Sequence, residues 1–452
     1  MIASIILAAG KGTRMKSKLP KVLHKVAGRS MLGHVLAAAK GAGATKNIII
    51  VGFGADEVKA AFESEAECVY QAEQLGTAHA VGTGTPLLAN TTGTVIVLCG
   101  DTPLLTADLL KALYQEHKAK GAAATVLAAT MPDATGYGRI IRNDKGELLK
   151  IVEQKDASEE EKQVKEVSSG IFCFEIPDLI RALPEVTNDN AQGEYYLPDV
   201  LDILRAKGKT IAAFVTDDYE STLGVNSRVQ LSQAEAILRE RKNTALMDSG
   251  VTIIDPKTTY IDCEVTVGQD TVILPNTYLE GSTTIGSNCE IGPGVRFTDM
   301  QVGNNVKTLF SYAHGAVVDD NVDFGPYVHL RPDTHLKANV HVGNFTEVKN
   351  STIGEGSKLA HLQYIGDADI GDNVNCGCGT VTANYDGKNK YRTTIGNDAF
   401  IGCQTCLVAP VSVGDGAYTA AGSVITKDVT AESLAVGRAK QTEIKNWQNK
   451  RK

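Results

Sequence analysis

The chain has 452 residues, more than one hydrophobic core usually supports, so we expect two or three domains. Its 43% hydrophobic and 22% charged residues are typical of an ordinary globular protein. The formal net charge of −8 argues against a nucleic-acid-binding surface over the whole molecule, so any site for an anion must be local.

Two apolar stretches and the cysteines indicate in which cellular compartment we expect the protein. MIASIILAAG at the N-terminus lacks the basic residues that precede the apolar part of a signal peptide. Residues 75–100 carry no Asp, Glu, Lys or Arg, but Gly, Pro, Asn and Thr interrupt them too often for a membrane span. Nine cysteines, an odd number, are expected as reduced thiols. We therefore expect a cytoplasmic protein with no membrane insertion.

Short β-rich runs alternate with helix-like segments over residues 1–226, as in SIIL, GHVLAAAKGAG, NIIIVGF and ADEVKAAFESEAE. This order predicts a mainly parallel sheet with helices on both faces. Ligands of such sheets bind at the carboxyl ends of the strands. Because LAAGKG and VLCGD both end strands, we expect the glycine loop and Asp101 to face one crevice.

The stretch LAAGKGTRMKSKLPKVLH, residues 7–24, matches neither common phosphate loop. It lacks the Walker pattern, and Met15 stands where a dinucleotide fingerprint requires its third glycine. A glycine turn with exposed N–H groups, together with Arg14 and Lys21, is suited to wrap a phosphate chain. The alternative interpretation is a solvated basic turn.

Other polar residues follow the predicted strands. Asp101 is placed as a ligand of a hard cation such as Mg²⁺, with substrate phosphates as further ligands. Gln74, Gly76 and Thr77 offer neutral hydrogen-bonding groups suited to a base edge, and Glu153 lies in a polar loop suited to sugar hydroxyls.

Residues 227–248 contain no Gly or Pro and place apolar residues on roughly one helical face, which predicts a connecting helix that Gly250 ends. We therefore expect three parts. These are an α/β domain at 1–226, a linker helix at 227–249, and a domain with a different sequence period and a C-terminal tail at 250–452.

A six-residue period follows the helix. Two runs of residues spaced six apart, all aliphatic except Thr419, are Ile261, Val267, Ile273, Leu279, Ile285 and Ile291, and Ile395, Ile401, Leu407, Val413, Thr419 and Ile425. This period is typical of a parallel β-helix, in which one aliphatic side chain per face points inward, whereas an antiparallel sandwich would show two-residue alternation. The period breaks at 375–392, and because insertions in solenoids form loops on one face, we expect a site there.

Cys376 and Cys378, with Cys403 and Cys406, resemble paired zinc-ligand spacings. The surrounding repeat explains their positions without a metal, so zinc is the less favoured interpretation.

The pattern L-A-A-G-x-G-T-R-M-x-S-x-x-P-K-V-L resembles the signature of sugar-phosphate nucleotidylyltransferases. Joined to a β-helix that contains RPDTHL, EVKNS, HLQYIGD and TANYDGKNK, it is similar to the bacterial bifunctional N-acetylglucosamine-1-phosphate uridyltransferase and glucosamine-1-phosphate N-acetyltransferase family. The similarity covers nearly the whole chain.

The resemblance implies an α/β Rossmann-like nucleotidyltransferase domain followed by a left-handed parallel β-helix. It also implies two reactions. Acetyl-CoA and glucosamine 1-phosphate give N-acetylglucosamine 1-phosphate in the C-terminal domain, and UTP converts that product to UDP-N-acetylglucosamine in the N-terminal domain, for peptidoglycan and other envelope polymers. Family members form trimers, so the resemblance implies a homotrimer.

For uridylyl transfer, the resemblance assigns residues by motif. The residues that match triphosphate contacts are Gly10, Gly12, Arg14 and Lys21, and those that match nucleotide contacts are Leu7, Ala8, Gln74, Gly76 and Thr77. The residues that match sugar contacts are Gly138, Glu153, Ser168 and Asn226. The residues that match Mg²⁺ ligands are Asp101 and Asn226. Ser168 departs from the usual Asn, and its shorter side chain puts that sugar contact in doubt.

For acetyl transfer, His361 matches the general base and Glu347 the carboxylate that orients it. The sugar phosphate and the coenzyme are implied to contact Arg331, Lys349, Tyr364, Asn375, Asn384, Tyr385, Lys390, Cys403, Ala421 and Arg438. Asn384 is suited to steady the tetrahedral oxyanion. Cys403 stands where some family members have Ser, and a thiol is a weaker hydrogen bonder.

Three questions stay open at this point. One alternative is a single-activity sugar-phosphate nucleotidylyltransferase with a structural β-helix, and another is a non-enzymatic scaffold that reuses both folds. The basic tail KNWQNKRK is either a solvated end or an arm that reaches the coenzyme site of a neighbouring subunit.

Overall fold

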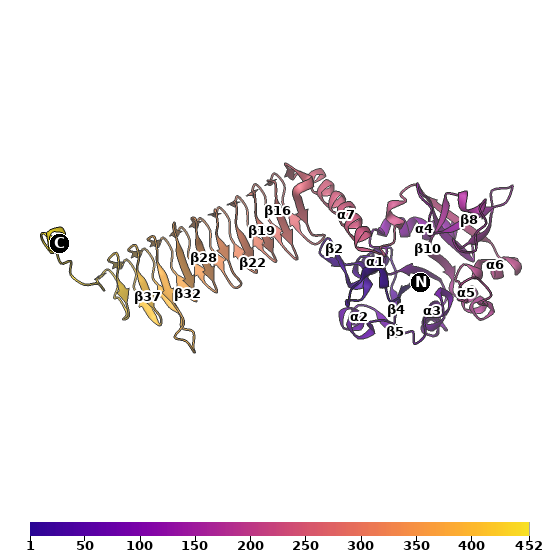
Figure 1. The fold of residues 1–452 in the computed structure, drawn as a ribbon, viewed down its shortest axis with the longest axis horizontal. Helices are drawn as coiled ribbons and strands as arrows, with labels where there is room; N and C mark the ends of the chain where they lie inside the picture. The colour runs from indigo at the N-terminus through magenta and orange to yellow at the C-terminus, as the bar shows by residue number, and fades with distance from the viewer. Residues whose placement is uncertain (452) are drawn as a thin grey trace. The chain divides into compact units, whose positions relative to one another are not determined.

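The computed structural model describes residues 1–451. It divides into two compact units, one before and one after the boundary between Leu238 and Arg239 (Figure 1). Each unit is built around its own buried apolar core and is described here by itself.

The first unit contains a central sheet. Its strands lie in the spatial order β11 (Ile211–Thr216), β7 (Ala124–Thr130), β10 (Glu166–Glu175), β6 (Thr94–Cys99), β1 (Ile2–Ala8), β4 (Lys46–Val51) and β5 (Glu67–Tyr70), with β8 (Gly138–Arg142) and β9 (Leu148–Val152) attached to β10. β10 runs antiparallel to its neighbours and the other main strands are parallel. The chain passes from β1 to β4 and β5 and then returns to β6 on the other side of β1, which makes the β1/β6 border the topological switch point.

Helices cover both faces of this sheet, as the sequence predicts. They are α1 (Met31–Gly41), α2 (Ala55–Phe62), α3 (Thr77–Gly84), α4 (Ala107–Ala119), α5 (Ile176–Ala182) and α6 (Asp199–Ala206), and a small hairpin of β2 (Lys25–Val26) and β3 (Arg29–Ser30) precedes α1. Along β1, Ile5 packs with α3, α5 and α6 on one face, whereas Ile6 packs with α1, α2 and α4 on the other. Both faces are apolar because both are covered, which is the pattern of a buried parallel sheet.

A long helix, α7 (Arg228–Asp248), follows, where the sequence predicts a helix over 227–248. Its first half packs Ala234 and Leu231 against a small cluster of the first unit that includes Met31 and Val225. Gly250, just beyond the helix, has φ +97, a conformation that favours glycine.

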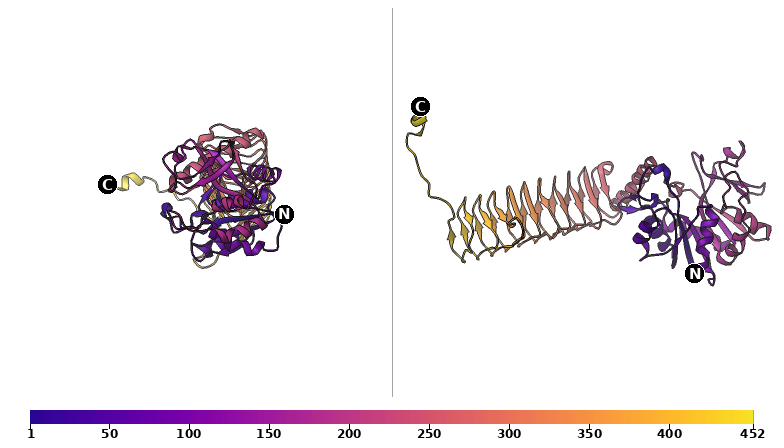
Figure 2. Two further views of the ribbon diagram at one scale, coloured as in Figure 1. Left: turned by 90° about the vertical axis from the view of Figure 1, so that its right-hand side faces the viewer. Right: turned by 60° about the horizontal axis from the view of Figure 1, so that its bottom comes forward.

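The second unit is a left-handed parallel β-helix of three sheets, whose stacked coils are seen in Figure 2. The first sheet contains β12 (Thr252–Ile253), β15 (Val272–Ile273), β18 (Glu290–Ile291), β21 (Lys307–Thr308), β24 (Asp323–Phe324), β27 (His341–Val342), β30 (Lys358–Leu359), β33 (Asn375–Cys376), β36 (Phe400–Ile401), β39 (Tyr418–Thr419) and β41 (Leu434–Ala435). The second contains β13 (Thr259–Ile261), β16 (Thr277–Glu280), β19 (Arg296–Thr298), β22 (Tyr312–His314), β25 (His329–Leu330), β28 (Thr346–Lys349), β31 (Gln363–Gly366), β34 (Val381–Ala383), β37 (Cys406–Val408) and β40 (Val424–Ile425). The third contains β14 (Thr266–Val267), β17 (Thr284–Ile285), β20 (Gln301–Val302), β23 (Val317–Val318), β26 (His335–Leu336), β29 (Thr352–Ile353), β32 (Ala368–Ile370), β35 (Thr393–Ile395) and β38 (Val411–Val413).

Residues spaced six apart point inward from successive sheets of this β-helix, and those one coil apart stack on one another. Ile273 pairs in register with Ile291, and Ile261 with Leu279, so each coil covers the apolar side chain of the previous one. Thr419, the one hydroxyl in the two predicted runs, is also buried, and its oxygen accepts a hydrogen bond from the Gly402 N–H at 2.9 Å. The predicted β-helix is therefore confirmed.

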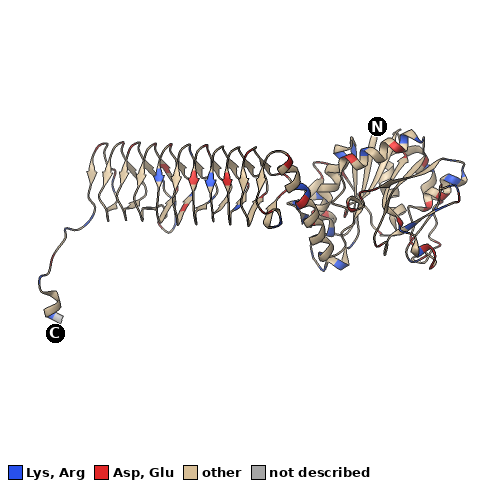
Figure 3. Ribbon diagram, turned by 90° about the horizontal axis from the view of Figure 1, so that it is seen from above, with Lys and Arg blue, Asp and Glu red and all other residues tan. Residues whose placement is uncertain are grey.

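Outward positions of the first sheet carry alternating charge. Glu290, Lys307 and Asp323 lie opposite one another in successive coils and give the row of alternating red and blue strands in Figure 3. Such a row is a solvated face with favourable cross-strand pairs.

The break in the period is smaller than the sequence predicts. The sequence places the break over the whole of 375–392, but β33 and β34 continue the first and second sheets with Cys376 and Thr382 inward. Small and polar residues can fill inward positions, which hides a coil from a search for aliphatic residues. The extra segment is residues 384–392, the loop that projects near the label β32 in Figure 1.

Beyond β41 the chain leaves the coil and ends in a short turn that begins at Trp447, whose side chain is exposed. In the part of the chain that the structure describes, no helix is both long and apolar enough to cross a membrane.

Two candidate active sites

The first candidate site is a cavity of about 290 Å³ at the carboxyl ends of β1 and β6. It lies at the switch point, where ligands of such sheets bind. Predicted residues that line it are Leu7, Ala8, Gly10, Lys21, Gln74, Gly76, Thr77 and Asp101. The glycine loop and Asp101 therefore do face one crevice.

Three segments bring a cation and two oxygens together in this cavity. The Lys21 ammonium donates to the Asp101 carboxylate at 2.5 Å and to the Asn226 amide oxygen at 3.0 Å. The Lys21 and Asp101 side chains are only 13% and 20% exposed, so this is a largely desolvated ion pair. The backbone holds the arrangement, because the Val225 N–H donates to the Asp101 carbonyl at 2.8 Å.

Gly12 positions Lys21. Its φ is +59, and a Cβ at this residue would lie 2.6 Å from the Lys21 Cβ. The stem of Lys21 therefore packs where only a glycine leaves room. Arg14 follows in a short turn (Thr13–Met15) and is exposed, outside the residues that line the cavity.

A second cavity, of about 190 Å³, adjoins the first and shares Leu7, Thr77 and Cys99 with it. Gly138, Glu153 and Ser168, all predicted sugar contacts, line it. Burial, followed by the nearby Asp156, Asp199 and Glu194 carboxylates, raises the pKa of Glu153.

Ser168, which replaces the expected amide, lies inside this second cavity. Its hydroxyl oxygen accepts a hydrogen bond from the Gly170 N–H at 3.2 Å, so its hydroxyl proton remains available to a ligand.

The second candidate site surrounds the 384–392 loop of the β-helix. Glu347 lies opposite Tyr364, and Lys349 opposite Gly366, in adjacent coils. A Cβ at Gly366 would lie 2.4 Å from the Tyr364 hydroxyl and 2.9 Å from the Asn384 Nδ2, so both side chains fold over this glycine.

Two lysines of this site lie side by side. The Lys349 ammonium lowers the pKa of Lys390, which the loop carries next to β28. Two ammonium groups that face each other are suited to share one anion, such as a phosphate. Tyr385 pairs with Lys390 across the loop, and its hydroxyl donates to the Gly387 carbonyl at 2.6 Å.

His361 has another neighbour than the Glu347 carboxylate that the resemblance implies. Glu347 accepts a hydrogen bond from Arg331 at 2.9 Å, and the His361 Nδ1 lies 3.3 Å from the Asn344 Oδ1 instead. The reason is the coil length, since Asn344 precedes His361 by 17 residues, one coil, and so lies directly beside it. Sequence reasoning missed Asn344, although counting back one coil would have found it.

The predicted coenzyme residues continue along the edge of the β-helix that carries His361. The Gly379 N–H donates to the Leu362 carbonyl, the Gln404 N–H to that of Cys378, and the Gly422 N–H to that of Cys403. A Cβ at Gly422 would lie 3.7 Å from the Arg438 Cδ. His361, Cys403, Ala421 and Arg438 therefore form one row, with Cys378 between the first two, whereas Asn375 lies on β33 between Lys358 and Phe400.

Known proteins resemble both halves of the chain. Residues 4–156 match the MobA-like NTP transferase domain family, and residues 264–299 and 392–427 match the bacterial transferase hexapeptide family. The curated relative "Bifunctional protein GlmU" of Geobacillus thermodenitrificans is 50% identical over 98% of this chain and 97% of its own. The same protein of Shouchella clausii is 51% identical over 99% and 98%, and that of Caldanaerobacter subterraneus over 100% and 98%, also at 51%.

The chain belongs to the GlmU family. It is a bifunctional enzyme of UDP-N-acetylglucosamine synthesis, with a nucleotidyltransferase domain that transfers uridylyl groups and a hexapeptide-repeat domain that transfers acetyl groups. Its substrates are small molecules, including a nucleotide and acetyl-CoA. A single-activity enzyme and a scaffold are thereby excluded, because identity of about half extends over both domains.

Several residues that line the cavities of this GlmU family member were not predicted from the sequence. They are Gln71, Cys99, Tyr137, Gly170 and Glu194. Cys99 is the last residue of β6 and lines both cavities, and burial raises the pKa of its thiol to about 12, so the thiol is neutral. Its place at a strand end beside Asp101 is the signal that would have found it.

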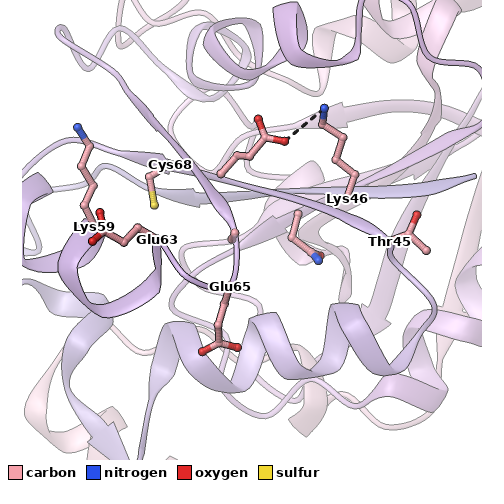
Figure 4. Close-up of a pocket in the computed structure, with 9 residues that line it drawn as sticks. Thr45, Lys46, Lys59, Glu63, Glu65 and Cys68 are labelled. Carbon is pink, nitrogen blue, oxygen red and sulfur yellow. Dashed lines mark ion pairs between the residues drawn. The ribbon is translucent and has the colours of Figure 1, made fainter.

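A further cavity lies away from both candidate sites. It measures about 690 Å³ and is lined by Lys46, Lys59, Glu63, Glu65 and Cys68, with an ion pair between Lys46 and Glu67 (Figure 4). Lys46 begins β4, so this cavity lies at the amino ends of the strands, opposite the edge where ligands of open α/β sheets bind.

Metal-binding groups are sparse. In the described part of the chain, no group of three or more His, Cys, Asp and Glu side chains could hold a metal ion. Cys376 faces the interior of the β-helix, where burial raises the pKa of its thiol to about 12, whereas Cys403 is exposed. A cation bound by Asp101 and Asn226 would need ligands from the substrate as well.

Proposed function

We propose that the first site transfers a uridylyl group from UTP to N-acetylglucosamine 1-phosphate, with Mg²⁺ held by Asp101 and Asn226. The observation that carries this proposal is the Lys21 ammonium, a cation already held by the oxygens of both residues. A carboxylate, an amide oxygen and substrate phosphates are the ligand set that Mg²⁺ prefers. When bound, the metal neutralises charge on the phosphates.

The protein's own residues then act by position and charge. A phosphate oxygen of the sugar phosphate attacks the α-phosphorus of UTP in line, and the bond to the β-phosphate breaks to release pyrophosphate. Arg14, Lys21 and the N–H groups near Gly10 and Gly12 stabilise the charge that grows on the phosphates. A Cβ at Gly10 would meet no atom within 4 Å, so open space remains there for a ligand.

The two adjoining cavities divide the rest of the substrate. We assign the nucleotide to the larger one, with Leu7, Ala8, Gln74, Gly76 and Thr77 as its contacts, and the sugar to the smaller one, with Gly138, Glu153 and Ser168. Asn226, beside Lys21, is assigned to the sugar as well as to the metal. The shared wall formed by Leu7, Thr77 and Cys99 supports this division, because the sugar phosphate must meet the α-phosphorus at the border.

Lys21→Met tests the proposed metal site directly. In the nucleotide-free protein the lysine ammonium competes with a divalent cation for the oxygens of Asp101 and Asn226. We expect the variant to bind Mn²⁺ at least about tenfold more tightly, since about 1.4 kcal/mol of lost competition gives a factor of ten, while uridylyl transfer falls. Paramagnetic resonance of free Mn²⁺ measures the affinity, with Lys18→Met as the control, and equal affinities for both variants would contradict the proposed ligands.

We propose that the second site transfers the acetyl group. The amine of glucosamine 1-phosphate attacks the thioester carbonyl, His361 takes a proton from the amine, and the coenzyme leaves as a thiol once that proton is returned. Asn344 supports this role, because an Nδ1–H bonded to its amide oxygen leaves Nε2 free to act as the base.

Cations around the loop support a phosphate subsite. Arg331, Lys349 and Lys390, with the Tyr364 hydroxyl, are assigned to the sugar phosphate, and Asn375, Asn384 and Tyr385 to the reacting end. The row of Cys403, Ala421 and Arg438 is assigned to acetyl-CoA because it continues the edge that carries His361.

We also propose a homotrimer in which this edge meets other copies of the chain. Beside His361 and on its N-terminal side, the edge carries Leu362, Phe345, Tyr327 and Phe310, which are 45–58% exposed. All four have φ between 42 and 60, a region that bulky residues rarely adopt and that other corners fill with Asn or Asp. Ring centroids of Tyr327 and Phe345 lie 5.5 Å apart. Strained, exposed and stacked apolar residues are typical of an interface.

Phe345→Asp tests the trimer. Asp tolerates a positive φ, so the isolated β-helix should keep its stability while the apolar edge gains a charge. We expect light scattering to give three times 48.0 kDa for the natural protein and a smaller species for the variant. Phe400→Asp, at a 41% exposed aromatic residue on the outer face of β36, is the matched control and should remain trimeric. A monomeric natural protein would contradict the proposal.

The compartment is proposed as the cytoplasm, as the sequence predicts. All nine cysteines are free thiols, which is typical of a reducing compartment.

A further inference from the structure

Asp367 is a buried carboxylate at the second site that the reaction above does not use. It is 6% exposed and follows β31 directly, one coil after Asn350 and one coil before Asn384. Its carboxylate accepts hydrogen bonds from both amides, from the Asn350 Nδ2 at 2.5 Å through Oδ1 and from the Asn384 Nδ2 through Oδ2.

This arrangement differs from that of two other acidic residues in the β-helix, Asp299 and Asp262. Asp299 accepts from the backbone N–H of Ser282 at 2.8 Å, and Asp262 from that of Gly281 at 2.8 Å. Those carboxylates fasten the backbone of a neighbouring coil. Asp367 instead holds two side-chain amides, one of which belongs to the proposed reacting end of the site.

An ionised carboxylate can only accept hydrogen bonds, so it dictates which way a neighbouring amide turns. With its Nδ2 held by Asp367, the Asn384 side chain has its oxygen free on the other branch of the amide. Asn384 is only 8% exposed and lies over Gly366 beside Tyr364, so the amide has little room to turn.

We propose that Asp367 is a positioning residue for acetyl transfer, which keeps the amide oxygen of Asn384 turned toward the substrate. The proposal rests on acetyl transfer at this site. It refines the role expected for Asn384, because an oxygen directed at the substrate accepts a hydrogen bond from the amine, whereas an oxyanion requires a donor.

Asp367 also belongs to the base of the 384–392 loop, which offers a matched control. The Tyr391 N–H donates to the Asn384 carbonyl at 2.8 Å and the Thr393 N–H to the Asp367 carbonyl at 3.0 Å. Arg392 pairs with the Asp369 carboxylate through two hydrogen bonds of 2.5 Å. Asp369 thus fastens the same loop without contacting an amide of the site.

Asp367→Asn replaces one acceptor oxygen of the carboxylate by an NH₂ donor and leaves the shape of the side chain unchanged. The new amide can accept from Asn350 through its oxygen, but its NH₂ group then faces Asn384, which must turn over to present an oxygen. After that turn the NH₂ group of Asn384, a donor, faces the substrate in place of its amide oxygen, an acceptor. We expect kcat of acetyl transfer to fall about 100-fold, with the KM for acetyl-CoA unchanged, because misplacing one group costs about that much. Uridylyl transfer by the same full-length protein should stay within about twofold.

The double variant Asp367→Asn with Asn384→Asp tests whether an oxygen facing the substrate is what the site requires. It restores one donor facing one acceptor at both contacts, so it should fold even if the single variant does not. We expect its thermal stability to return to that of the natural protein and its acetyl transfer to recover to within about tenfold, because the carboxylate that replaces the Asn384 amide again presents an oxygen to the substrate. Asp369→Asn should stay within about twofold in both reactions.

Two results would overturn the proposal. One is a folded Asp367→Asn variant whose kcat for acetyl transfer stays within twofold of the natural protein. The other is a double variant that regains thermal stability while its acetyl transfer stays as low as that of the single variant, although it again presents an oxygen to the substrate. Failure of the proposed site itself is recognised separately, since it would leave acetyl transfer intact in a His361→Ala variant.

Discussion

Asp101→Ala is expected to abolish uridylyl transfer and to leave acetyl transfer unchanged. The change removes the one carboxylate at the end of β6 that faces Lys21, and with it a proposed ligand of Mg²⁺. Losing a group that stabilises charge in a transition state costs about 10²–10³-fold in kcat. The loss here should reach at least the upper value, because the proposed metal is affected as well as the position of Lys21. Release of pyrophosphate from UTP measures the reaction.

The control for this variant is Asp108→Ala. Asp108 lies in the same unit, on the first turn of α4, and its side chain is 93% exposed. Within the described residues its ion pair is with Lys111. It should keep full uridylyl transfer. If Asp101→Ala lost acetyl transfer to a similar degree, the two sites would not be independent and the assignment of Asp101 would fail.

His361→Ala is expected to have the opposite effect. Without a base, the amine of glucosamine 1-phosphate stays protonated for most of the time and cannot attack the thioester. Removing a general base costs about 10²–10⁴-fold. Release of coenzyme A thiol measures the reaction, and uridylyl transfer from supplied N-acetylglucosamine 1-phosphate should be unchanged.

A second histidine of the β-helix serves as the comparison. His341 lies on an outward position of β27, 42% exposed, with its Nδ1 at 2.5 Å from the Asp323 carboxylate. His341→Ala removes a similar partly exposed side chain and should keep acetyl transfer. Equal activity of the two histidine variants would mean that another group is the base.

Much of the fold could be predicted because its physical causes are local. The six-residue spacing of Ile273, Ile285 and Ile291 follows from one inward side chain per face, and each of them is buried as expected. The alternation of apolar runs with helices likewise predicts the sheet with two covered faces. Where the inward residue is Cys376 or Thr382, the same rule fails, because a polar or small residue fills the position.

Contacts between distant segments could not be read in the same way. Lys21 contacts Asp101 and Asn226, which lie 80 and 205 residues further along the sequence. No local sequence pattern indicates contacts over such separations. His361 pairs with Asn344 because one coil is 17 residues there, while the coil that contains the 384–392 loop places Arg392 23 residues after Asp369. Site residues are therefore predicted from strand ends and coil neighbours only after the length of each coil is known.

The most direct test of two separate sites is one measurement on the natural protein, in which both reactions are followed while Mg²⁺ is titrated against EDTA. We predict that pyrophosphate release disappears as the free metal is removed and returns when Mg²⁺ is restored, because only the first site combines a carboxylate, an amide oxygen and substrate phosphates. Release of coenzyme A thiol should continue at the same rate throughout. Loss of thiol release together with pyrophosphate release, or persistence of both, would contradict the account.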